Sequence, residues 1–77
     1  MAKQVIVYHQ PNCSACKAAM QFLAQKGINY VSKDIAVDEQ ARNELVALGS
    51  QATPTIKVDN EILIGFNIRK LSAALGI

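Results

Sequence analysis

The spacing of apolar and polar residues changes several times along the chain, and each change predicts a new element of secondary structure. The run QVIVYH at residues 4–9 is rich in β-branched and aromatic residues, so it predicts a strand that ends before Pro11-Asn12. Over residues 14–26 apolar side chains recur at spacings of three and four, which predicts a helix followed by Gly27. The apolar face of this helix consists of Cys16, Ala19, Met20 and Leu23.

Three later segments also have the composition of strands. They are INYVSKDI, TPTIKV and EILIGF, at residues 28–35, 53–58 and 61–66. Only Asp59-Asn60 separates the last two segments, and both of these residues tolerate the positive φ that a two-residue hairpin turn needs. We therefore expect the last two strands to pair as an antiparallel hairpin.

Two further polar residues are placed to begin helices. Asp38 can cap a helix that Gly49 ends, and Asn67 can cap a last helix. The side chains expected to face inward on these helices are Ala41, Leu45, Leu48, Ile68, Leu71 and Leu75. The order β-α-β-α-β-β-α contains a strand–helix–strand unit, which favours a parallel pair. It therefore predicts an α/β fold with a mixed four-stranded sheet flanked by helices.

Composition and charge exclude several classes of protein. At 77 residues with 51% hydrophobic side chains, the chain fits a single small domain spanning 1–77. A scattered net charge of +2 predicts no nucleic-acid or membrane partner. The start MAKQVIVYHQ lacks the apolar region of a signal peptide, and no segment approaches the ~20 apolar residues of a membrane span. We therefore expect a cytoplasmic protein, in which a close cysteine pair is more often catalytic or metal-binding than structural.

Three interpretations are open for the cysteine pair, Cys13 and Cys16. A structural disulfide would close a very short loop, so it would restrict the unfolded chain little. A structural zinc site needs four ligands, whereas the chain offers one C-x-x-C and a single histidine, His9, which also fits a polar residue leaving a strand. An iron–sulfur cluster held between two copies would supply the missing thiolates. The third interpretation is a redox pair.

The redox interpretation explains why Cys13 stands at the start of a helix. Unpaired N–H groups and the helix dipole favour a thiolate there, and Lys17 one turn on adds positive charge. Cys16 belongs to the apolar face and is therefore shielded. Cys13 is then the nucleophile that attacks a substrate disulfide, and Cys16 resolves the mixed disulfide. The couple carries two electrons without a bound cofactor.

The neighbours of the pair support this arrangement. Pro11 and Asn12 end the first strand immediately before Cys13, which places the thiol at the helix start. Ser14 and Ala15 are small and uncharged, so they leave the approach to the sulfur open.

The C-x-x-C between a first strand and a helix, with Thr53-Pro54 before a later strand and Gly65-Phe66 after the hairpin, resembles the glutaredoxin branch of the thioredoxin fold. The resemblance implies a cis peptide bond before Pro54, which would lie against the cysteine pair. From its position alone, Pro54 also fits a trans proline that starts an edge strand. The resemblance further implies that Ala52-Thr53-Pro54 shapes the substrate groove and that the Thr53 backbone pairs with an extended substrate.

The chain departs from the glutathione-using members of that family. Its site reads CSAC rather than C-P-Y-C, Gln10 replaces a basic residue, and Arg69 and Lys70 stand near the acidic positions of those members. Gly65-Phe66 is instead similar to NrdH-redoxins, which thioredoxin reductase reduces and which donate electrons to ribonucleotide reductase; Phe66 equally fits core packing.

Taken together, the resemblance implies a monomeric dithiol–disulfide oxidoreductase that acts on disulfide-containing proteins, ribonucleotide reductase among them. Its reducing equivalents would come from thioredoxin reductase and NADPH. Two alternatives stay open, namely a glutathione-dependent glutaredoxin and an iron–sulfur cluster or metal carrier that uses the C-x-x-C.

Overall fold

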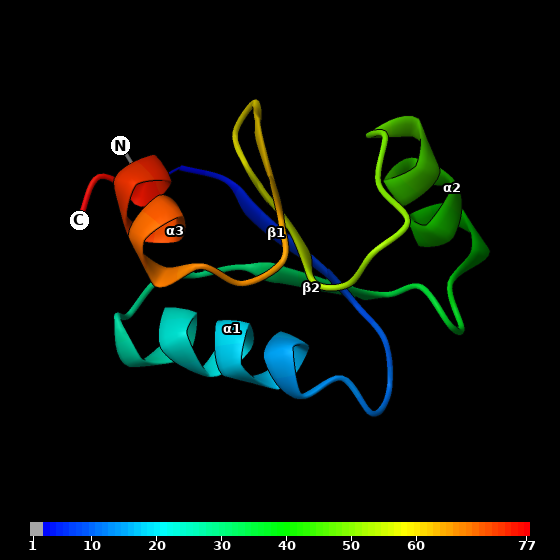
Figure 1. The fold of residues 1–77 in the computed structure, drawn as a ribbon, viewed down its shortest axis with the longest axis horizontal. Helices are drawn as coiled ribbons and strands as arrows, with labels where there is room; N and C mark the ends of the chain where they lie inside the picture. Colours follow the sequence, from blue (N-terminus) through cyan, green and yellow to red (C-terminus); the bar gives the residue numbers. More distant parts are fainter. Residues whose placement is uncertain (1–2) are drawn as a thin grey trace.

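The computed structural model describes residues 3–77, and its elements follow the predicted order (Figure 1). The elements are β1 (Val5–His9), α1 (Ser14–Gln25), β2 (Val31–Asp34), α2 (Glu39–Ala47), β3 (Thr55–Val58), β4 (Glu61–Ile64) and α3 (Ile68–Leu75). The strands form one sheet in the order β2-β1-β3-β4. β1 runs parallel to β2 and antiparallel to β3, and β3 pairs antiparallel with β4. The predicted mixed sheet is confirmed.

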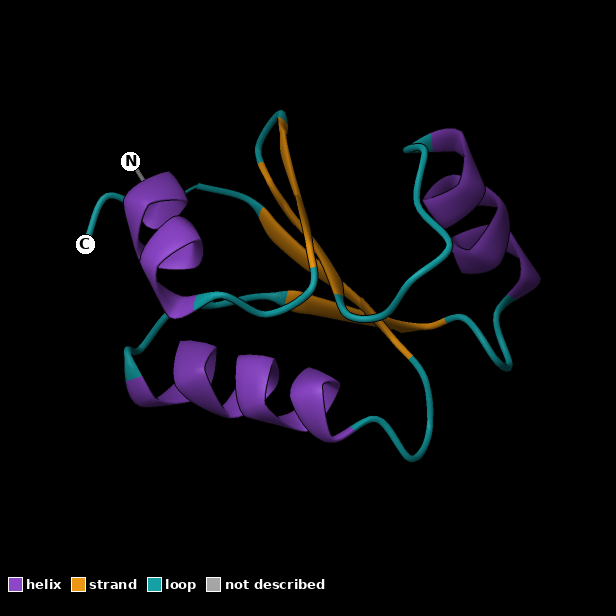
Figure 2. Ribbon diagram, in the orientation of Figure 1, coloured by secondary structure: helices purple, strands orange, loops and turns teal. Residues whose placement is uncertain are grey.

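Helices cover both faces of the sheet, as Figure 2 shows, with α1 and α3 on one face and α2 on the other. The alternation along β1 explains this division, because Val5 and Val7 pack toward α1 and α3 whereas Tyr8 packs toward α2. The larger core consists of Val5, Val7, Ala19, Leu23, Ile56, Val58, Leu71 and Ala74. Of the helices in residues 3–77, none combines the length and apolar character needed to cross a bilayer.

Each helix begins at a residue whose own side chain accepts a backbone hydrogen bond. Asp38 accepts from the N–H of Ala41 and Asn67 from that of Lys70, each at 3.1 Å, so both predicted caps are confirmed. The hairpin turn also forms as predicted, with Asp59 at a φ of 51°. Its carboxylate accepts a 2.8 Å hydrogen bond from the N–H of Gln4, which fixes the turn to the start of β1.

The structure corrects the sequence prediction at four places. The fourth strand ends at Ile64 rather than at residue 66, because Gly65 takes a positive φ. The second strand is shorter than 28–35, because Ile28 and Tyr30 pack against the core before β2 begins. The third strand starts at Thr55 rather than residue 53, since the segment before it forms a turn. Ile68 does not face inward, for its side chain is 55% exposed in the first turn of α3, and burial comes from Leu71 and Ala74 further along the helix.

Candidate active site

Cys13 and Cys16 lie at the start of α1 and are joined as a disulfide, with their Cα atoms 5.2 Å apart. Cys13 is the N-cap of α1, with extended φ and ψ of −112° and 100°. The extended backbone of Cys13 departs from helical geometry, and this departure lets its sulfur reach that of Cys16 three positions ahead. The N–H of Cys16 donates to Cys13 Sγ at 3.2 Å, so the sulfur occupies the place of a capping oxygen.

The two sulfurs differ sharply in their access to solvent. Cys16 is only 1% exposed and shares its buried helix face with Ala19 and Leu23, as the sequence predicts. Cys13 is half-buried. A substrate disulfide approaching from outside therefore meets the sulfur of Cys13 first.

The segment before β3 lies against this pair. The peptide bond between Thr53 and Pro54 is cis, which confirms what the family resemblance implied. The Thr53 carbonyl oxygen is 3.8 Å from Cys13 Sγ, and its hydroxyl oxygen is 3.9 Å from the same sulfur. The side-chain amide of Gln10 donates to the Thr53 hydroxyl at 2.9 Å. The fold thus brings together two loops that are far apart in the sequence.

Gly65 and Phe66 take different places around this segment. The N–H of Gly65 donates to the carbonyl oxygen of Pro54 at 2.7 Å, so Gly65 holds the cis-proline segment from the side of β4. The ring of Phe66 packs against that of Phe22 in α1, with centroids 5.9 Å apart. Phe66 therefore packs against the core, and the ring that it meets belongs to α1 rather than to the last helix.

The remaining predicted residues surround the pair without touching its sulfurs. Asn12 has a φ of 62°, which turns the chain from β1 toward α1, and Pro11, Ser14 and Ala15 are exposed. The Lys17 side chain is exposed and forms no hydrogen bond or ion pair within residues 3–77. Its ammonium group therefore makes no hydrogen bond to the sulfur within residues 3–77.

The described chain gathers no obvious metal site. His9 is half-buried at the end of β1, where its partner in β2 is Asp34. Among residues 3–77, no three His, Cys, Asp or Glu side chains lie together in a way that could hold a metal ion. A cluster bound through Cys13 and Cys16 would therefore need ligands from a second molecule.

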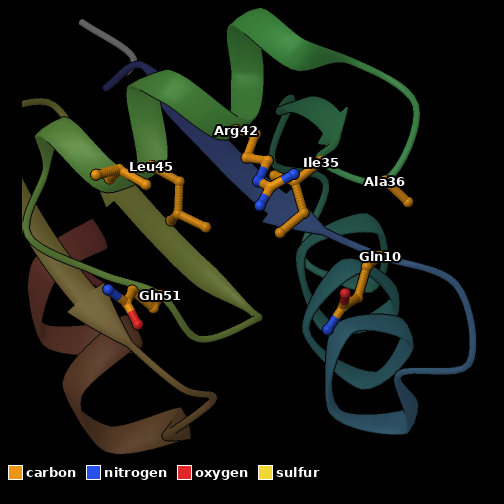
Figure 3. Close-up of a pocket in the computed structure, with 7 residues that line it drawn as sticks. Gln10, Ile35, Ala36, Arg42, Leu45 and Gln51 are labelled. Carbon is orange, nitrogen blue, oxygen red and sulfur yellow. The ribbon is translucent and has the colours of Figure 1, made fainter.

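A groove of about 520 Å³ lies between α2, the end of β1 and Gln51, the residue that precedes Ala52-Thr53-Pro54 (Figure 3). Its lining consists of Gln10, Ile35, Ala36, Arg42, Leu45, Val46 and Gln51. Arg42 is the single charged side chain of this lining, and Gln10 connects the groove to Thr53 through their hydrogen bond. Arg42 and Gln51 carry no signal in the sequence, because each is an ordinary polar residue until the fold places both in the lining of one groove.

The comparisons with known proteins agree with this geometry. The sequence model of the Glutaredoxin family matches residues 5–63. An uncharacterized glutaredoxin-like 8.6 kDa protein from the rubredoxin operon of Clostridium pasteurianum is 36% identical over 62 residues, which cover 79% of this chain and 83% of that protein.

Two solved structures share the fold. The thioredoxin-like protein BC3987 is 37% identical, with a TM-score of 0.90 over 94% of this chain and 100% of that one. The glutaredoxin-like protein NrdH-redoxin from Escherichia coli is 17% identical, with a TM-score of 0.83 over 91% of this chain and 92% of that one. The predicted thioredoxin-like fold is thus confirmed.

Proposed function

Because the chain belongs to the glutaredoxin family, we propose that it is a dithiol–disulfide oxidoreductase that reduces protein disulfides. Cys13 is the nucleophile and Cys16 the resolving thiol. One observation carries this proposal: an accessible sulfur caps a helix while its buried partner lies within bonding distance. We further propose that the protein is a monomer with a single domain and that it acts in the reducing cytoplasm.

The reaction uses the groups at the start of α1. In the reduced protein, the Cys16 N–H and the helix dipole stabilise the thiolate of Cys13. This thiolate attacks one sulfur of the substrate disulfide, whose S–S bond breaks, and the other substrate sulfur leaves and takes a proton from water. Cys16 then loses its proton and attacks Cys13 Sγ, which expels the second substrate sulfur. Two electrons have passed to the substrate, and the protein is left as the disulfide.

The cis-proline segment is proposed to hold the substrate beside the sulfur. Among residues 3–77, no backbone group pairs with the N–H or C=O of Thr53. The carbonyl oxygen lies 3.8 Å from Cys13 Sγ, and both groups can pair with an extended polypeptide, in the manner of a strand added to a sheet edge. The groove with Arg42 continues from this point and suits a substrate segment that carries a carboxylate.

The proposed reductant is thioredoxin reductase with NADPH, and no cofactor needs to bind the protein itself. Two features disfavour glutathione as the reductant. Gln10 is uncharged and donates to Thr53, so it supplies no cation for a glutathione carboxylate. Arg69 and Lys70 are exposed at the start of α3, where they would repel the positively charged amine of glutathione. Ribonucleotide reductase is the proposed class of target, by likeness to NrdH-redoxins. Glutathione is the second candidate reductant, favoured by Arg42 in the groove beside Thr53, because that guanidinium suits a carboxylate.

Coupled assays test the proposal and separate the two reductants. NADPH consumption is followed during reduction of a protein disulfide, once with thioredoxin reductase and once with glutathione and its reductase. Turnover with thioredoxin reductase supports the proposal, whereas efficient turnover only with glutathione overturns the choice of reductant. Failure in both arms, matched by a Cys13→Ser control, overturns the enzymatic role. Visible absorbance after anaerobic purification would instead indicate a cluster carrier.

A further inference from the structure

Two buried hydroxyl groups flank the cis-proline segment. Ser50 is 3% exposed and Thr55 is 0% exposed, and they are the two buried polar residues in the described part of the chain. Their hydroxyl oxygens lie 2.7 Å apart, with Ala52, Thr53 and Pro54 looping between them. A buried hydroxyl is costly unless it is hydrogen-bonded, so the partners of this pair define what it does.

The partners form a closed ring around Ala52. The Ala52 N–H donates to Ser50 Oγ at 3.3 Å, and the Thr55 hydroxyl donates to the Ala52 carbonyl oxygen at 2.7 Å. The Ser50 hydroxyl also lies 3.4 Å from the Ala52 carbonyl oxygen, but the 2.7 Å bond from Thr55 to that oxygen is the shorter one. Because Thr55 has one proton and gives it to Ala52, Ser50 is the donor in the 2.7 Å bond between the hydroxyls. Each hydroxyl then donates once and accepts once, and both peptide groups of Ala52 are satisfied.

The ring leaves one residue of the segment with free peptide groups. The N–H and C=O of Ala52 are hydrogen-bonded to the two hydroxyls, and the carbonyl oxygen of Pro54 accepts a hydrogen bond from the N–H of Gly65. Proline has no N–H. Thr53, whose carbonyl oxygen is 3.8 Å from Cys13 Sγ, is therefore the residue of this segment that can pair with a substrate backbone.

We propose that Ser50 and Thr55 are positioning residues for substrate binding. Their hydroxyls fix Ala52 so that Thr53 alone presents its N–H and C=O to an extended polypeptide beside Cys13. The inference rests on the proposed function and sharpens it: Ala52, predicted as a substrate-binding residue, shapes the segment instead of pairing with the substrate. It also favours substrates with an extended backbone next to the disulfide over disulfides that lack one.

The test compares two substrates with pre-reduced protein in single turnovers, so that no reductase is needed. One is a peptide disulfide with an extended backbone, and the other is Ellman's aromatic disulfide, which has no peptide groups. Thr55→Val removes the hydroxyl and keeps the side-chain volume. We expect it to remove both hydrogen bonds of that hydroxyl and to raise the half-saturating peptide concentration about three- to tenfold, on the order of the net effect of one buried hydrogen bond. The maximal rate and the rate with the aromatic disulfide stay within about twofold.

Thr55→Ser is the matched control, because it restores the hydroxyl and is expected to behave as wild type. Ser50→Ala removes the other hydroxyl and its hydrogen bonds to Ala52 and Thr55. This variant replaces Thr55→Val in the test if circular dichroism shows that Thr55→Val is unfolded. Equal effects of Thr55→Val on both disulfides, or none on the peptide, would overturn the inference alone. A wild-type protein that reduces neither disulfide would overturn the proposed function itself.

Discussion

The hydrogen bond between Tyr8 and Glu44 predicts an unusual dependence of stability on alkaline pH. The Tyr8 hydroxyl donates to Glu44 Oε1 at 3.0 Å, and Lys33 Nζ lies 2.7 Å from the same oxygen. These contacts tie α2, which carries Arg42 of the groove, to β1 and β2. The perturbation is Tyr8→Phe, which removes the hydroxyl and leaves the ring in the core.

The size of the stability loss at alkaline pH follows from the ionisation of the Tyr8 phenol. Burial, followed by the hydrogen bond to Glu44 and the charge of that carboxylate, raises the pKa of Tyr8 from 10.0 to about 12. The folded protein therefore holds this proton more tightly than the unfolded chain. The stabilising effect of the protonated phenol is complete below pH 10 and is lost as pH rises toward 12. Two pH units correspond to about 3 kcal/mol, of which about half is lost by pH 11.

Urea denaturation of the disulfide form, in which no thiol titrates, measures this effect. Tyr8→Phe is expected to be about 1 kcal/mol less stable than wild type at pH 7, because it lacks the hydrogen bond. The difference should shrink above pH 10 and approach zero near pH 11, where wild type has lost a similar amount. Tyr30→Phe is the control, since Tyr30 makes no side-chain hydrogen bond within residues 3–77. A Tyr8→Phe difference that stays constant from pH 8 to 11 would refute the reasoning.

Four further outcomes are expected. At mildly acidic pH iodoacetamide should modify Cys13 before Cys16, as read by mass spectrometry of peptides, and the reverse order would contradict the roles assigned here. Cys16→Ser should accumulate a mixed disulfide with substrate, visible on non-reducing gels, whereas prompt release of substrate would argue against a resolving role. A hydrogen bond from Lys33 lowers the pKa of Glu44, so the ionised carboxylate stabilises the fold above the ordinary glutamate pKa and this stabilisation is lost in acid. Glu44→Gln should therefore reduce the loss of stability at acidic pH. An unchanged loss in this variant would count against the role of Glu44. Arg42→Glu should weaken binding of a peptide disulfide that carries a carboxylate while sparing its amide counterpart, and equal weakening of both peptides would exclude the charge contact.

Features that depend on neighbouring residues were predictable from the sequence. The caps at Asp38 and Asn67 form because each side chain reaches a backbone N–H only three positions ahead. Cys13 stands at the start of α1 because Pro11-Asn12 ends the preceding strand, and Cys16 is buried because it belongs to an apolar helix face. The thiol pair and its asymmetry therefore follow from local chemistry. The cis bond before Pro54 followed only from family resemblance.

The surroundings of the pair were decided by tertiary structure. Gln10 meets Thr53 across 43 positions of sequence, and the Ser50–Thr55 ring closes only because the chain turns back on itself before β3. Arg42 is one more exposed helix residue until α2 packs beside the cis-proline segment. Periodicity and capping report which residues are near in sequence, whereas these contacts depend on strand register and on which helices share a face. The sequence by itself thus determined the position and the unequal burial of the two sulfurs. The packing of distant segments decided which side chains and peptide groups surround them.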